Sequence, residues 1–104
     1  MNTKVYIPNK SIHDFSSAEE FGELYYLSEG NINRYNTSRL FRKFYPLLKD
    51  SQKEDYLLIS GLTIANIVAA FILTLKHKRL NLLLFKTYNS RKGYVERILI
   101  GEDF

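Results

Sequence analysis

The chain has 104 residues, 45% of them hydrophobic and 25% charged, and this balance excludes an intrinsically disordered chain. It has room for a single core, so we expect residues 1–104 to form one compact domain. The absence of cysteine excludes disulfides, thiolate nucleophiles and cysteine-based zinc sites. Residues 1–38 carry three basic and five acidic side chains, whereas residues 39–100 carry twelve basic and four acidic ones. This asymmetry suggests an anionic partner, although a solvated surface is the simpler interpretation.

The first third of the chain predicts two strands and a short helical turn. Residues 4–8 (KVYIP) form a β-rich run that a proline ends, and residues 23–30 (ELYYLSEG) form a second strand closed by a glycine. Between them lies a pattern that fits a capping box with a glycine stop: Ser16 with Glu19, or Ser17 with Glu20, followed by Gly22.

Residues 36–50 (NTSRLFRKFYPLLKD) predict a helix that begins at one of three capping residues, Asn36, Thr37 or Ser38. Apolar residues recur at helical spacing with basic residues around the opposite side: Leu40, Phe41, Phe44, Leu47 and Leu48 against Arg39, Arg42 and Lys43. Pro46 lies inside this pattern, where it removes a hydrogen bond and clashes with the preceding turn. We therefore expect either a kink or a break near Tyr45 followed by a short second turn.

The most apolar run of the chain, residues 57–75 (LLISGLTIANIVAAFILTL), permits two interpretations. As one helix it would span about 28 Å, nearly enough to cross a membrane, and the basic KHKR that follows would suit the cytoplasmic end. Against this, Gly61 interrupts the run and Asn66 places an amide inside it. The segment before Gly61 also suits a strand buried on both faces. We favour a buried strand, a tight turn and a buried helix over a membrane span.

The remaining elements complete an α/β fold. A helix over residues 62–76 is apolar on most sides, with a polar or small stripe at Thr63, Asn66, Ala70, Thr74 and His77. Residues 79–89 predict a buried strand, and residues 94–100 predict a return strand after a hairpin loop in which Gly93 takes a positive φ. The order β-β-α-β-α-β-β predicts a mixed sheet with a parallel centre and a C-terminal antiparallel hairpin.

The turn at residues 60–63 is a candidate anion site. Ser60, Gly61, Thr63 and Asn66 lie where a parallel strand passes into a helix, and such a turn offers free backbone N–H groups. The run lacks the further glycines of a dinucleotide fingerprint and the Lys-Ser/Thr pair of a P-loop. A tight turn with a capping hydroxyl is therefore the simpler interpretation.

Three groups of basic residues are candidates for contacting nucleic acid or a protein partner: Arg39, Arg42 and Lys43; Lys76, Lys78 and Arg79; and Arg91 and Lys92 at the hairpin tip. Neighbouring tyrosines offer rings on which bases could stack, as single-strand binders require: Tyr35, Tyr45, Tyr88 and Tyr94. No nucleic-acid-binding motif accompanies them. The second group also has a structural explanation, because cations stabilise a helix C-terminus.

The two histidines, His13 and His77, are the side chains with ordinary pKa values near neutrality. Asp14 follows the first and lysines surround the second, so no series of nucleophile, base and orienting group is visible. Their spacing predicts no metal site. We therefore expect a protein that is not an enzyme and needs no cofactor.

Residues 55–97 (DYLLISGLTIANIVAAFILTLKHKRLNLLLFKTYNSRKGYVER) resemble a group of small bacteriophage-encoded proteins. Those proteins show an acidic loop, a D-Y-L-L-x-S-G strand and turn, an alanine-rich helix, and a strand and hairpin ending in tyrosine. The earlier FGELYYLSEG is similar to their F-G-E-L strand, so the resemblance covers residues 15–97. It implies phage origin and a setting in the host cytoplasm, but no activity and no site residues.

These features predict a non-enzymatic α/β protein that binds a host or phage macromolecule, with a protein partner favoured. Nucleic acid bound by the basic surface is one alternative, and a small nucleotide or anion at Ser60–Thr63 is another. We expect a soluble cytoplasmic protein, since the N-terminal residues also lack the apolar core of a signal peptide. An apolar edge strand or helix face would support a homo-oligomer.

Overall fold

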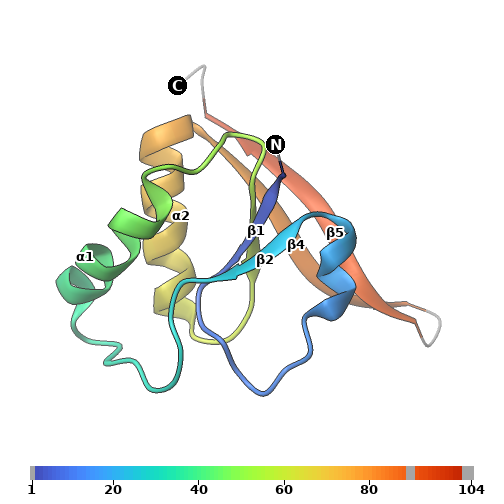
Figure 1. The fold of residues 1–104 in the computed structure, drawn as a ribbon, viewed down its shortest axis with the longest axis horizontal. Helices are drawn as coiled ribbons and strands as arrows, with labels where there is room; N and C mark the ends of the chain where they lie inside the picture. Colours follow the sequence, from blue (N-terminus) through green and yellow to red (C-terminus); the bar gives the residue numbers. More distant parts are fainter. Residues whose placement is uncertain (1, 89–90, 102–104) are drawn as a thin grey trace.

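A computed structural model shows a five-stranded sheet, two α-helices and one short 3-10 helix (Figure 1). It describes residues 2–88 and 91–101, with the backbone alone at Tyr88 and Arg91. The elements in chain order are β1 (Lys4–Ile7), η1 (Ser16–Glu20), β2 (Glu23–Tyr26), α1 (Thr37–Leu48), β3 (Tyr56–Ile59), α2 (Thr63–His77), β4 (Arg79–Tyr88) and β5 (Arg91–Ile100).

The strands lie in the order β2-β1-β3-β4-β5. β1 is parallel to β2 and β3, β3 is parallel to β4, and β4 pairs antiparallel with β5. The predicted mixed sheet with a parallel centre is therefore confirmed. The hairpin turn falls at residues 89–90, outside the described residues. Gly93 lies inside β5 opposite Lys86 and lacks the predicted positive φ, because it continues a strand and makes no turn.

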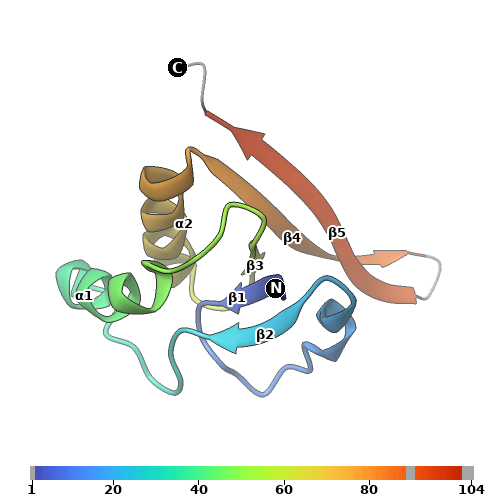
Figure 2. The ribbon, with the colours of Figure 1, turned by 45° about the horizontal axis from the view of Figure 1, so that its top comes forward.

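Two hydrophobic cores lie on the two faces of the sheet. Both α-helices cover one face and η1 covers the other (Figures 1 and 2). Because successive strand residues point to opposite faces, the neighbours Leu57 and Leu58 enter different cores, and both are fully buried. On the helix side Leu57 packs with Phe44 and Leu48 of α1 and Ala69 of α2, among others.

α1 begins at a predicted cap and continues through its proline. Asn36 is the cap: its Oδ1 accepts a hydrogen bond from the backbone N–H of Arg39 at 3.1 Å. The helix runs on to Leu48, so the alternative of a break near Tyr45 is wrong. Pro46 lies in the last turn and is exposed, where its missing N–H removes only one helical hydrogen bond.

The apolar run divides at Gly61, as the sequence favoured. β3 ends at Ile59, and Gly61 has a φ of +68° that residues with side chains rarely adopt. The Asn66 side chain joins the two elements: its Nδ2 donates to the carbonyls of Ser60 and Leu62 at 3.0 Å each, and its Oδ1 accepts from the Ser60 N–H at 3.3 Å. Across residues 2–88 and 91–101, no helix is long and apolar enough to cross a membrane.

The helical turn before β2 forms as a 3-10 helix, but the predicted capping box is wrong. Phe15 holds the N-cap position of η1, and its side chain makes no capping hydrogen bond. The Asp14 carboxylate instead accepts a hydrogen bond from the Ser16 N–H at 2.8 Å, and this bond lowers the pKa of Asp14. Gly22 is needed for a different reason from a helix stop. A Cβ there would lie 2.5 Å from the carbonyl oxygen of Thr3, so the backbone before β1 leaves no room for a side chain.

We expect Asn66→Ala to lower the free energy of unfolding by about 1–3 kcal/mol, because it leaves backbone groups of Ser60 and Leu62 without their partner. Urea denaturation measures this change. Thr74→Ala is the matched control on the exposed side of α2 and should alter stability by less than about 0.5 kcal/mol. Equal effects of the two substitutions would contradict the role of Asn66.

His77 predicts a pH dependence of stability. Its Nε2 lies 2.8 Å from the Oγ of buried Ser51, and burial, together with Lys76, lowers the pKa of His77 below its ordinary 6.5. As the pH falls, His77 therefore binds a proton in the unfolded chain before it does so in the folded chain. The stability due to neutral His77 is present above pH 6.5 and is lost as the pH falls below that value. In urea titrations across this range, the free energy of unfolding of the His77→Gln variant should fall less steeply with decreasing pH than that of the wild type. Parallel curves would contradict the prediction.

Candidate functional site

The side of α2 that faces solvent is apolar. Ile67, Phe71 and Leu75 recur every four residues on one helix face, and their side chains are 56%, 54% and 63% exposed. The polar or small residues of this helix do not form one solvent face, because Asn66 is buried and His77 is partly buried. α2 is apolar on most sides, and the sheet and α1 cover only some of them.

α1 lies beside α2 (Figure 2) and adds two aromatic rings to this apolar surface. Phe41 and Tyr45 stack with their ring centroids 5.7 Å apart, and Phe41 also lies 6.2 Å from the ring of Phe71. Phe41 borders two depressions of 370 Å³ and 270 Å³ between the helices. We call the surface formed by five of these side chains the helix groove: Phe41, Tyr45, Ile67, Phe71 and Leu75.

Every charged side chain of the two helices that carries a full charge at neutral pH is basic. α1 carries Arg39, Arg42 and Lys43, α2 carries Lys76, and neither helix contains aspartate or glutamate. All four cations are exposed, and Lys76 lines the smaller depression of the helix groove. The charges that the two helices themselves contribute are therefore all positive, and Lys76 lies at the helix groove.

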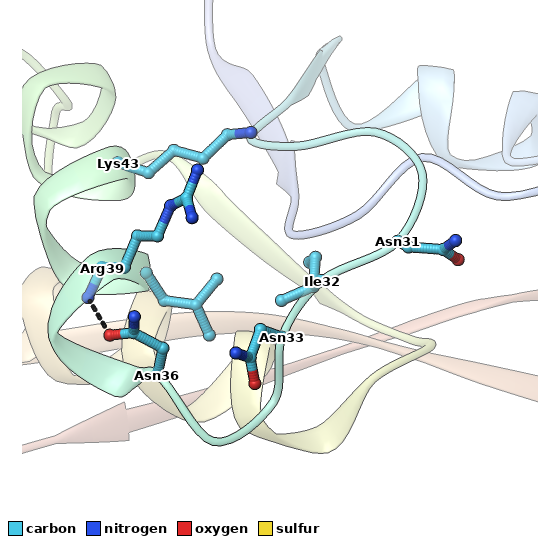
Figure 3. A pocket seen from close by; sticks show the side chains of 7 residues that line it. Asn31, Ile32, Asn33, Asn36, Arg39 and Lys43 are labelled. Carbon is cyan, nitrogen blue, oxygen red and sulfur yellow. Dashed lines mark hydrogen bonds between the residues drawn. The ribbon is translucent and has the colours of Figure 1, made fainter.

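A pocket of 280 Å³ lies along the other flank of α1. Figure 3 shows Arg39 and Lys43 extending from the helix over its opening, with Asn31, Ile32 and Asn33 on the facing loop. Asn36 and Leu40 complete the lining. Among the residues that the structure describes, neither Arg39 nor Lys43 forms an ion pair. This Arg39–Lys43 pocket thus combines two cations with three side-chain amides and an apolar floor.

The other predicted cations lie elsewhere. Lys78 ends α2 with a φ of +54°, and the Arg79 Nε donates a hydrogen bond to Asn81 Oδ1 at 2.8 Å. Lys92 lines a groove beside the hairpin that shares no lining residue with the Arg39–Lys43 pocket. The side chain of Arg91 lies outside the described residues, as does that of Tyr88. The basic residues are therefore spread over separate regions of the molecule.

The predicted anion site at the β3–α2 turn borders this hairpin groove, whose volume is 650 Å³ and whose lining includes His13, Gly61, Lys92 and Tyr94. Ser60 also lines it, but the Ser60 N–H already donates to Asn66, and Thr63 is exposed without lining the groove. Asn66 holds the turn and its amide is fully engaged. An anion at this turn stays a prediction.

The two histidines are not brought together. His13 lies in the hairpin groove, whereas His77 contacts Ser51 at the far end of α2. Within residues 2–88 and 91–101, no three histidine, aspartate or glutamate side chains are grouped so that they could hold a metal ion.

The sequence singled out Arg39 and Lys43 but missed the helix groove and the loop asparagines. A signal for the groove was present: Ile67, Phe71 and Leu75 recur at helical spacing in a helix that is apolar on most sides. Since residues 2–88 and 91–101 contain one other α-helix, one side of such a helix stays uncovered by them.

Comparison with known proteins places the chain in a family. No curated protein and no solved structure matches it. The model of a family described as phage Pam3 gp32-like protein matches residues 3–98. This match supports the resemblance to phage-encoded proteins, while the D-Y-L-L-x-S-G pattern as a mark of the family stays a prediction. Because the match covers most of the chain, the chain belongs to the phage Pam3 gp32-like protein family.

Proposed function

We propose that this protein is a non-enzymatic binding protein that docks an acidic, partly apolar segment of a protein partner across α1 and α2. The helix groove is the observation that carries the proposal. Three apolar side chains of α2 are more than half exposed beside the stacked rings of Phe41 and Tyr45. Apolar surface gains roughly 25 cal/mol for each Å² removed from water, so contiguous exposed apolar patches mark interaction surfaces.

The charges around the helix groove select the chemistry of the partner. Lys76 lines the smaller depression, Arg42 is exposed on α1, and neither helix supplies an acid to neutralise them. A segment with apolar residues flanked by aspartate or glutamate would match both features. A second copy of the same face would instead bring like charges together. The helix groove therefore favours a different protein over self-association.

The Arg39–Lys43 pocket can take one acidic side chain of the same partner. A guanidinium group binds a carboxylate through two parallel hydrogen bonds, and a lysine ammonium adds a third donor. Asn33 and Asn36 line the same cavity; their Oδ1 atoms already accept the backbone N–H groups of Tyr35 and Arg39, so their amide N–H groups are the further donors that they can offer. Since no acid pairs with Arg39 or Lys43 in the part of the chain that is described, their donors are available to a partner.

Nucleic acid is the second candidate, and the same pocket favours it, because phosphate oxygens meet arginine and lysine as carboxylates do. The helix groove has no role in that alternative. The remaining cations also lie in separate regions and do not continue the pocket into one track for a phosphate backbone. A protein partner explains both the apolar and the basic features.

Phe71→Asp should weaken recognition of the partner, because it puts a charge at the centre of the helix groove. The tagged protein is used to capture partners from nuclease-treated host lysate, and the captured protein is then purified and titrated. We expect affinity to fall by at least about tenfold, as for a central apolar contact. Thr74→Asp adds the same charge to an exposed site of α2 outside both depressions and should change affinity by less than about twofold.

Two results would contradict the proposal. Loss of all capture after nuclease treatment would indicate nucleic acid, and equal affinities of the Phe71→Asp and wild-type proteins would remove the helix groove from the interface.

Lys43→Glu should weaken the same complex, because it reverses a charge at the mouth of the Arg39–Lys43 pocket. We expect about a tenfold loss of affinity at low salt and a smaller loss at high salt, where charge interactions are screened. Lys53→Glu is the control, since Lys53 is exposed and lines neither the pocket nor the helix groove. Equal losses from both variants would show that only net charge matters.

A further inference from the structure

β5 forms a long edge of the sheet, and no strand in the described part of the chain pairs with its outer side. It is last in the strand order and ten residues long, whereas the opposite edge, β2, has only four residues. All residues from Glu96 to Ile100 are exposed, and three consecutive ones are large and apolar: Ile98 (44%), Leu99 (58%) and Ile100 (55%). Natural sheets usually protect such edges with charges, proline or a covering element, because an open edge is a template for another strand.

The hydrogen-bonding direction of each residue in β5 follows from the β4–β5 ladder. The Gly101 N–H donates to the Lys78 carbonyl at 2.9 Å, which extends the register in which Leu80 lies opposite Leu99. In an antiparallel pair, residues alternate between bonding to the partner strand and facing away from it. Leu99 and Arg97 therefore bond to β4, whereas the N–H and C=O groups of Glu96, Ile98 and Ile100 point outward from the edge.

The side chains limit how a second β5 can add to this edge. Two identical antiparallel strands pair about a two-fold axis, and the residue at the axis lies opposite itself. An axis at Glu96 or at Arg97 would oppose like charges, and an axis at Ile98 would place charged Arg97 and Glu96 opposite apolar Leu99 and Ile100. An axis at Leu99 places Leu99 opposite Leu99 of the partner subunit. It also places Ile98 of each copy opposite Ile100 of the other copy. It also uses the outward-facing groups of Ile98 and Ile100 for the new hydrogen bonds.

We propose that β5 pairs antiparallel with β5 of a second copy about an axis at Leu99, which joins the two sheets into one. Apolar contacts then form on both faces, because Ile98 and Ile100 point to one side and Leu99 to the other. A side-chain hydrogen bond also ties β5 to the centre of the sheet: the Tyr56 hydroxyl of β3 donates to Glu96 Oε2 at 2.6 Å. The edge is thus anchored to the sheet while its outward backbone groups are unoccupied by any described element.

A second copy fits this edge better than it fits the helix groove. The exposed segment of β5 carries one acid and one base, Glu96 and Arg97, whereas the helices carry only cations. Within residues 96–101, self-pairing of β5 about Leu99 therefore places no like charges opposite each other. The two surfaces share no residue, so failure of one proposal leaves the other in place.

The experiment is sedimentation velocity on the full chain from about 10 μM to about 1 mM, a range chosen because strand pairing over one short edge is a small and therefore weak interface. Wild type should shift from monomer toward dimer as the concentration rises. Ile98→Pro removes an outward N–H but no bond to β4, so it should stay monomeric with an unchanged far-UV circular dichroism spectrum. Ile98→Lys, which keeps the backbone intact and adds charge at the edge, should also stay monomeric. A wild-type monomer at every concentration, or a dimer that both variants retain, would overturn the proposal.

A cysteine cross-link tests the register, since the native chain has no cysteine. In the proposed register, Leu99 and Leu99 of the partner subunit form a non-hydrogen-bonded pair. The Cα atoms of such a pair lie about 4.5 Å apart, within disulfide range. Leu99→Cys should therefore form a disulfide dimer under mild oxidation, whereas Thr87→Cys, exposed on β4, should not. Equal rates for the two variants would overturn the pairing.

Discussion

The side-chain amide of Asn66 holds the turn on which the arrangement of this molecule depends. Its three hydrogen bonds to Ser60 and Leu62 fix the direction in which the chain leaves β3 and enters α2. Gly61 supplies the left-handed φ that makes so short a connection feasible. The direction of α2 then sets the place of α1, which meets it through Phe41, and of the loop after α1, where Ser51 contacts His77.

Both proposed binding surfaces follow from how few layers a chain of this size can build. One face of the sheet has two helices to cover it, so α2 is covered by the sheet and by one neighbour, and its outer apolar side faces solvent. The sheet also ends at β5, with no further strand beyond it among the described residues. The two surfaces differ in charge, because the helices carry basic but no acidic side chains, whereas the exposed part of β5 carries one of each. This difference is why we assign an acidic protein partner to the helices and a second copy to the strand.

The sequence indicated those features that depend on local chemistry. Gly61 and Asn66 interrupt the apolar run, which predicted the division into β3 and α2, and Asn36 was among the candidate caps of α1. Features set by distant neighbours were not predictable in the same way. Gly22 is required because the Thr3 carbonyl lies against it, and that contact exists only once β1 and β2 pair. Arg39 and Lys43 were recognised as basic, but the cavity beneath them depends on the path of the loop that carries Asn31.

The central claim is that the helix groove is the surface that meets the partner. Hydroxyl-radical footprinting of the protein alone and in its purified complex tests this claim directly, because Phe71 on α2 and Phe85 on β4 are equally exposed at 54%. The account predicts that oxidation of Phe71 falls on complex formation while that of Phe85 is unchanged. Protection of Phe85 with Phe71 still fully reactive would contradict it.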